Sequence, residues 1–337
     1  RKTVITMRSS KFYTVLFSLI CAGVFCTGCK DNTYTVPDGV KGFTNDCLKR
    51  STGPNMVGST IDFSYAMAMP FHSGNITLAK VEASIPGDAG TYMEHRSFHT
   101  GTGGQDIGVE VGDPSVTEGA STTVVFTRDT CASTLRYYYQ IPEEARGKKV
   151  SFKFSAVDDK GKSVSYKMGP YQISNMDMKL DIELKNNQYF SIADMAAYDA
   201  SAIAEMPEKA DFVYLFRSIR GVAFRHAFVS PNAENVERGY LPGVNLPAGV
   251  EKSTPLLKTF SSSDQQLARN EYGVFVDDLD LQTIDLSSAP DYGINIAQNA
   301  GAWLETADGQ YRAYVYVNKA SETRAGMTIS IKRLKVK

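Results

Sequence analysis

The sequence predicts a mainly β protein, with an N-terminal immunoglobulin-like antiparallel β-sandwich followed by a second β-rich domain with short helices and long loops. Three observations predict this class. Short segments alternate between apolar and polar residues, turns of Gly, Pro and Asp separate them at short intervals, and no long helical periodicity is present. The clearest alternation places Val150, Phe152, Phe154 and Ala156 on one face of an extended strand.

The first expected domain spans residues 43–175 and contains the most regular strands. Its Val150–Ala156 strand ends at the turn Asp158–Lys162 and leads into Val164 and Tyr166, so we expect a hairpin there. The Cys, Trp and Cys signature of true immunoglobulin domains is missing, so the predicted sandwich is only immunoglobulin-like. Further strands are expected at Ile61–Met67, Thr122–Phe126 and Leu135–Ile141.

Near Asn175 the pattern of the sequence changes from closely spaced strands to strands separated by helix candidates and long loops. Residues 176–337 are therefore expected to form the second domain. A helix is expected within Ile192–Met206, and another after Asp264, whose side chain suits an N-cap. The stretch Pro231–Pro255 is rich in Pro and Gly and is expected to be loop. Strands are expected at Leu180–Leu184, Phe212–Phe216, Tyr311–Val317 and Met327–Ile331.

The last expected strand leaves two alternatives open. Met327, Ile329 and Ile331 share one face, whereas Leu334 and Val336 fall on the other. Either a bulge intervenes near Lys332 and Arg333, or both faces of the strand are covered.

Residues 1–28 have the layout of a secretory signal peptide that begins at Met7, and residues 1–6 read as an upstream extension of the reading frame. A basic start with Arg8 and Lys11 precedes the apolar stretch Phe12–Phe25. That stretch is shorter than the roughly 20 residues of a membrane-spanning helix, so a cleaved signal is the better interpretation.

The run Cys26-Thr27-Gly28-Cys29 resembles the lipobox of bacterial lipoproteins, in which the Cys29 thiol would be acylated. A secreted protein with an incidental cysteine is the alternative. Lys30-Asp31 resembles the surface-export signal of Bacteroidetes lipoproteins, and residues 29–42 read as a polar tether. We therefore expect an outer-membrane lipoprotein that is held in the membrane lipid by Cys29 and faces the cell surface, with the periplasmic face as the alternative.

The charge balance argues against nucleic acid as a partner. The chain has 36 basic and 37 acidic residues, a formal net charge of −1, and no run rich in Lys or Arg. It contains 18 Tyr and 17 Phe, which favours a β-rich extracytoplasmic protein. Beyond the signal and the anchor, Cys47 and Cys131 remain; they can form a disulfide in an oxidising compartment or stay as two separate thiols.

No metal or cofactor site is expected. His95 and His99 would share a face on a helix, but the glycines and proline around them favour a loop or strand, where they lie roughly 13 Å apart. The acidic run Asp277–Asp280 could offer oxygen ligands to calcium, but it lacks the EF-hand spacing and is read as a solvated loop. The sequence also has no GxSxG turn and no P-loop, so we expect a protein that is not an enzyme.

Two aromatic positions are candidates for binding. Trp303 lies beside a turn at Asp308 and Gly309 and could stack on a sugar, although a core anchor is the alternative. Within the triple Tyr137-Tyr138-Tyr139, a strand would place Tyr138 opposite its neighbours, facing solvent or another domain.

Several phrases together resemble an uncharacterised family of Bacteroidales lipoproteins that is described as a domain of unknown function. The phrases are NDCLKRSTGP, DFSYAMAM, VEASIPGDAGTYME, RYYYQIPEEARGKKVSFKFSA and GPYQISNMDM. The resemblance extends over most of the chain after the signal. It implies a two-part β-rich architecture in the cell envelope, and it carries no activity and no functional residues.

Three functional hypotheses follow. In the first, the protein binds a glycan or another nutrient beside an outer-membrane import system. In the second, it is a structural, adhesion or protein-interaction module of a surface assembly. In the third, it is an envelope hydrolase with an unrecognised site. The first hypothesis requires an exposed aromatic surface, the second an exposed sheet edge or apolar patch, and the third converging carboxylates.

Overall fold

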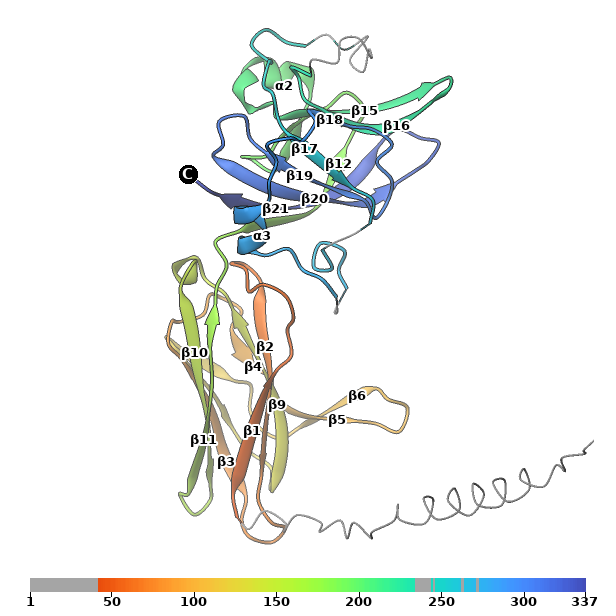
Figure 1. Ribbon diagram of the computed structural model, residues 1–337. Helices are drawn as coiled ribbons and strands as arrows, with labels where there is room; N and C mark the ends of the chain where they lie inside the picture. Colours follow the sequence, from red (N-terminus) through yellow and green to blue (C-terminus); the bar gives the residue numbers. More distant parts are fainter. Residues whose placement is uncertain (1–41, 234–243, 245, 262–263, 271–272) are drawn as a thin grey trace, which may run out of the picture. The chain divides into compact units, whose positions relative to one another are not determined.

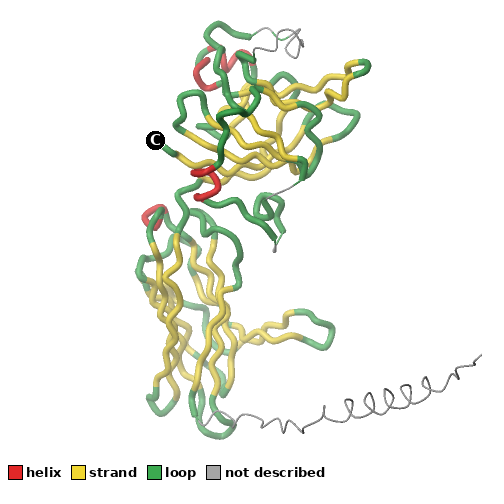
Figure 2. Tube along the Cα trace, viewed as in Figure 1, coloured by secondary structure: helices red, strands yellow, loops and turns green. Residues whose placement is uncertain are grey.

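The computed structural model describes residues 42–233, 244, 246–261, 264–270 and 273–337. Strands dominate this part of the chain, and its helices are few and short (Figure 2). Over these ranges, no helix combines the length and the apolar character needed to cross a bilayer. Gly42–Lys337 form one compact unit, in which each sheet draws its strands either from residues 44–172 or from residues 177–335 (Figure 1). The predicted fold class is confirmed.

The first set of strands forms a sandwich of two antiparallel sheets. The four-stranded sheet has the order β1 (Thr44–Lys49), β2 (Thr60–Ala68), β9 (Ala132–Gln140) and β4 (Tyr92–Met93). The five-stranded sheet has the order β11 (Ser163–Gln172), β10 (Lys149–Asp158), β3 (Ile76–Ala83), β8 (Ser121–Val125) and β7 (Val116–Glu118), and the 3-10 helix η1 (Glu143–Ala145) precedes β10. A separate hairpin of β5 (Arg96–Thr100) and β6 (Asp106–Glu110) extends away from the sandwich (Figure 1).

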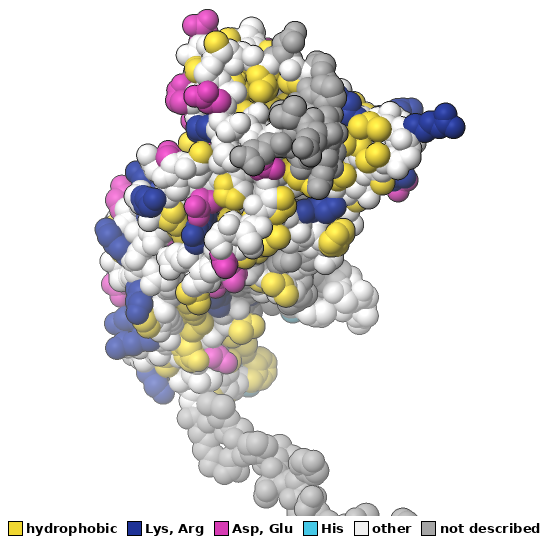
Figure 3. All heavy atoms as spheres, turned by 45° about the horizontal axis from the view of Figure 1, so that its top comes forward, with side chains coloured by type: hydrophobic (Ala, Val, Ile, Leu, Met, Phe, Trp, Pro, Cys, Tyr) yellow, Lys and Arg dark blue, Asp and Glu magenta, His cyan; other side chains and the backbone are white. Residues whose placement is uncertain are grey.

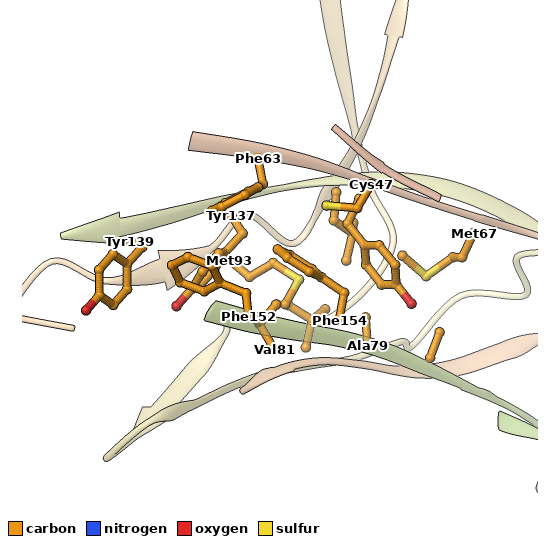
Figure 4. Packing of buried hydrophobic residues seen from close by; sticks show 14 of the residues in the cluster. Cys47, Phe63, Met67, Ala79, Val81, Met93, Tyr137, Tyr139, Phe152 and Phe154 are labelled. Atoms are coloured by element: carbon orange, nitrogen blue, oxygen red, sulfur yellow. The ribbon is translucent and has the colours of Figure 1, made fainter. Parts of the chain in front are cut away.

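An aromatic core holds the two sheets of the sandwich together. Phe63 of β2 and Phe152 and Phe154 of β10 are all buried, although they come from opposite sheets. The ring centroid of Phe63 lies 4.8 Å from that of Phe152 and 5.2 Å from that of Phe154 (Figure 4). Tyr137 and Tyr139 of β9 are buried among the same rings. Burial of these large apolar rings is the main favourable term for the sandwich, because each removes extensive surface from water.

The second set of strands forms two further antiparallel sheets. One has the order β12 (Asp177–Leu184), β21 (Met327–Lys335), β20 (Tyr311–Ala320), β19 (Gly301–Glu305) and β17 (Leu256–Thr259). The other has the order β14 (Ala196–Tyr198), β13 (Tyr189–Ser191), β15 (Phe212–Ile219), β16 (Val222–Val229) and β18 (Tyr292–Gly293). Short helices are α2 (Ala200–Ala204), η2 (Pro207–Lys209) and α3 (Asp278–Thr283).

The helix expected within Ile192–Met206 is present as α2, but the one expected after Asp264 is wrong. Residues 265–269 form turns. The Asp264 carboxylate does accept the N–H of Leu267 at 2.7 Å, as an N-cap would. It also accepts the N–H of Val276 at 2.9 Å, so the same side chain closes a loop instead of starting a helix.

For the last strand, the structure shows that both faces are covered. Met327, Ile329 and Ile331 are buried on one side of β21, and the alternating residues Ser330, Lys332 and Leu334 are buried on the other. Pairing of β21 with β20 is regular from Tyr311 to Val317, so no bulge intervenes near Lys332.

Candidate functional site

The outer face of the four-stranded sheet contains a row of aromatic and acidic side chains. In the antiparallel register, Tyr138 of β9 lies opposite Tyr92 of β4 on one side and opposite Asp62 of β2 on the other. Directly opposite residues of antiparallel strands project to the same face. Tyr137 and Tyr139 are buried in the core, so Tyr138 projects to the outer face, as the sequence predicted for a strand.

The two tyrosines of this row form a stacked pair. Their ring centroids are 5.0 Å apart with an angle of 22° between the ring planes. Tyr92 is 44% exposed, and Tyr138 is half-buried beside it. Partial burial raises the pKa of Tyr92, and the neighbouring Tyr138 and Glu94 raise it further. The Tyr92 phenol is therefore neutral at physiological pH and can donate and accept hydrogen bonds.

Arg136 lies two residues from Tyr138 on β9, roughly 7 Å further along the same face. Its guanidinium group packs over the Phe98 ring of β5, 4.0 Å from the ring centroid, and pairs with Asp106 of β6. Ser97 accepts the backbone N–H of Thr134 at 3.0 Å. These contacts fix the base of the β5–β6 hairpin against β9, beside the tyrosine row.

Two polar atoms on this face are buried without a protein partner. Asp62 Oδ1 and Arg136 Nε are both covered, and neither bonds to any residue in the described ranges. A buried polar atom that lacks a hydrogen bond is uncommon in proteins, because its desolvation is not compensated. One is an acceptor and the other a donor, and both lie beneath the surface of this face. We call Tyr92, Tyr138, Asp62 and Arg136 the tyrosine face.

The other predicted binding residue, Trp303, lies in the second set of strands. It is half-buried on β19, and its ring centroid is 4.6 Å from that of Tyr314. It packs against a buried cluster that includes Leu267, Val276 and Leu281. This is the arrangement of a core anchor, so we base the binding proposal on Tyr138.

The cysteines and histidines singled out by the sequence do not meet on the tyrosine face. Cys47 is a buried free thiol in β1 and Cys131 a half-buried free thiol before β9, so the structure has the alternative of two separate thiols. His99 lies in the strand β5, as the surrounding glycines indicated. His95 contacts Glu110 at 3.4 Å. Cys29 lies outside the described residues.

The acidic run Asp277–Asp280 serves local structure. Asp277 caps α3, and its carboxylate accepts the backbone N–H groups of Leu279 and Asp280. The Asp280 carboxylate accepts the N–H of Asp277 in return, which completes a capping box. Asp278 accepts the N–H of Asn175 at 2.8 Å. Across the described ranges, no cluster of three or more His, Cys, Asp or Glu is arranged to hold a metal ion.

Sequence reasoning missed Tyr92, Asp62 and Arg136. Tyr92 belongs to a strand of only two residues, which is too short to show a period. Asp62 and Arg136 are ordinary polar residues at outward positions of β2 and β9, and only the pairing register brings them to Tyr138. The alternation of apolar and polar residues in β9 predicts that Tyr138 faces outward. It does not predict which residues of the neighbouring strands lie beside Tyr138.

A crystal structure of a DUF4466 family protein from Parabacteroides merdae is 42% identical to this chain, with a TM-score of 0.81. The match covers 88% of this chain and 100% of that one. The chain belongs to the DUF4466 family. The family resemblance drawn from the sequence is therefore confirmed, and lipid attachment at Cys29 stays a prediction.

Family models divide this DUF4466 protein into two regions. Residues 40–173 match the domain of unknown function DUF4466, and residues 174–336 match another, DUF8576. The major pilin subunit BcpA of Bacillus cereus matches at 9% identity and a TM-score of 0.28, covering 81% of this chain and 58% of that one. The Actinomyces fimbrial adhesin FimA matches at 11% identity and a TM-score of 0.25, covering 88% and 97%. Scores this low carry no argument about function. No curated protein matches the chain.

Proposed function

We propose that this DUF4466 protein is a surface lipoprotein of the outer membrane that binds a glycan without cleaving it, beside an import system. The stacked pair of Tyr92 and Tyr138 is the observation that carries the binding proposal. Cys29 would carry the lipid anchor, and Lys30-Asp31 would act as the signal for export to the cell surface.

The chemistry of the tyrosine face matches a sugar ring. The apolar C–H face of a pyranose can lie on the exposed ring of Tyr92, because an aromatic ring offers an apolar surface of similar size. The hydroxyl groups at the edge of that sugar can then form hydrogen bonds with polar side chains of the same face, such as Asp62. A small number of placed polar groups beside an apolar surface is the usual composition of a specific ligand site.

The test is a glycan array probed with the protein, followed by calorimetry with each oligosaccharide that binds. Tyr92→Ala and Tyr138→Ala are each expected to weaken binding about 5- to 150-fold, since each removes about 1–3 kcal/mol of ring contact. Phe71→Ala is the matched control, because Phe71 is an aromatic side chain that is 77% exposed away from the tyrosine face. Equal affinity of the tyrosine variants and the control, or release of shortened oligosaccharide, would contradict the proposal.

The β5–β6 hairpin favours a second candidate function, a protein-interaction module of a surface assembly. Ile107 and Val109 are exposed on the same face of β6. A two-stranded hairpin with exposed aliphatic residues can add a strand from a partner at its open edge. A pull-down from native outer membranes separates the candidates, because a transporter pair supports glycan import and fibre subunits support assembly. Ile107→Ser with Val109→Ser should abolish recovery only in the second case.

A further inference from the structure

The end of the β15–β16 hairpin is an exposed tip that combines aliphatic and basic side chains. The turn consists of Arg220 and Gly221, and Gly221 has a φ of 80°, which favours glycine. Ile219 and Val222 face each other across this turn, with 37% and 45% of their surface exposed. Every residue of Ser218–Ala223 is exposed. We call Arg217–Ala223 together with Arg225 the basic hairpin tip.

Positive charge is concentrated at this tip. Arg217 and Arg225 lie directly opposite each other in the register, and Arg220 occupies the turn. Like charges in such a pair destabilise a sheet unless a counter-charge is near. Arg225 pairs with Glu322 at 3.2 Å, but both side chains are largely exposed, so water screens this pair. The Arg217 guanidinium contacts the neutral amide oxygen of Asn187. Figure 3 shows basic side chains at the protruding end of the hairpin, with hydrophobic ones beside them.

The base of the hairpin is firmly packed, so the tip is held out from a stable sheet. Leu215 and Phe224 are fully buried. The backbone N–H of Phe216 donates to the Asn186 side chain at 2.7 Å. His226 stacks on Tyr214 and bonds to its hydroxyl group at 2.8 Å. The aliphatic and basic side chains of the tip lie beyond this base and do not pack into the core. Folding therefore does not require these residue types at the tip.

We propose that the basic hairpin tip binds an anionic lipid surface. The guanidinium groups would bind lipid phosphates, and Ile219 and Val222 would enter the boundary between headgroups and acyl chains. Charge complementarity favours a lipid, because the tip carries three arginines and contacts one carboxylate, Glu322. A soluble polyanion would use the arginines but would not need the aliphatic pair.

The experiment is co-sedimentation of residues 42–337 with phosphatidylcholine vesicles, with and without phosphatidylglycerol. This fragment is one compact unit and corresponds to the whole chain crystallised from Parabacteroides merdae. It lacks Cys29 and no glycan is added, so the outcome depends neither on acylation nor on glycan binding. We expect binding to the anionic vesicles only, weakening as salt is raised. Arg220→Gln should lower the partition coefficient about fivefold, the usual contribution of one basic residue near such a surface.

The double variant Ile219→Ser, Val222→Ser should lower partitioning about tenfold, because two aliphatic side chains no longer enter the lipid. The matched control is Val116→Ser with Val125→Ser, which removes two exposed aliphatic side chains from the neighbouring strands β7 and β8. Absence of wild-type binding overturns the proposal. So does equal binding to neutral vesicles. Unchanged binding of the Ile219, Val222 variant would show a simple polyanion site and would also overturn it.

Discussion

Replacing Lys332 with Met should lower the free energy of unfolding by about 3–5 kcal/mol, the usual cost of leaving one partner of a buried ion pair alone. Lys332 and Asp264 are both 0% exposed, and Lys332 Nζ lies 2.6 Å from Asp264 Oδ2. The same ammonium group donates to the carbonyl of Val276 at 2.9 Å. Burial lowers the pKa of Lys332, and the Asp264 carboxylate opposes that shift. Met retains most of the length and apolar volume of Lys, so the loss reports mainly on the charge.

Urea unfolding of residues 42–337 measures this loss. Lys319→Met is the matched control, because Lys319 lies on the neighbouring strand β20 and is exposed; its substitution should change stability by less than about 0.5 kcal/mol. Adding Asp264→Asn to Lys332→Met should recover part of the stability, since the uncompensated charge disappears. A loss below about 1 kcal/mol for Lys332→Met would refute the reasoning. It would mean that the N–H groups of Leu267 and Val276 stabilise the Asp264 carboxylate by themselves.

Two further predictions concern buried groups. Burial lowers the pKa of His226, so the unfolded state binds a proton more tightly, and the free energy of unfolding should decrease as the pH falls below about 6.5 through the lower folded pKa. Unfolding measured between about pH 7 and pH 5 should show this decrease in the wild type but not in His226→Gln; identical profiles would contradict it. Burial raises the pKa of Cys47 to about 12, so in native residues 42–337 a thiol reagent should modify Cys131 and reach Cys47 only after unfolding. Failure of both to react in the unfolded protein would indicate a disulfide.

The sandwich could be predicted because the residues of its core alternate regularly with outward residues within each strand. Each inward residue of β9 and β10 alternates with an outward one, and this period is visible without knowledge of any partner strand. The second set of strands follows this alternation less clearly, since β21 is buried on both faces. There the buried polar residues Ser330 and Lys332 interrupt the apolar pattern. Asp264 compensates the buried charge of Lys332, but it lies 68 residues away in the sequence.

The tyrosine face could be predicted only in part, for the same reason. The period of β9 determines that Tyr138 faces outward, but Tyr92 and Asp62 reach it only through pairing with β4 and β2. The register of paired strands depends on the turns that connect them and on the packing of the whole core. It therefore cannot be derived from one sequence alone. Trp303 shows the same limit, since the sequence left a sugar platform and a core anchor open, and only the neighbouring Tyr314 and the buried cluster place its ring against the core.

The tyrosine face and the basic hairpin tip each combine exposed aromatic or aliphatic side chains with neighbouring charged groups. Alternation predicts polar side chains at outward strand positions, because they gain nothing from the core. Tyr92, Ile219 and Val222 break this rule, and each is substantially exposed. Single exposed apolar residues are common on protein surfaces, so it is their grouping with charged neighbours that supports the two binding proposals. The two sites can therefore be told apart from structural positions: substitutions at Tyr92 should change glycan binding alone, substitutions at Ile219 and Val222 lipid binding alone, and both sets should leave stability within about 1 kcal/mol of the wild type.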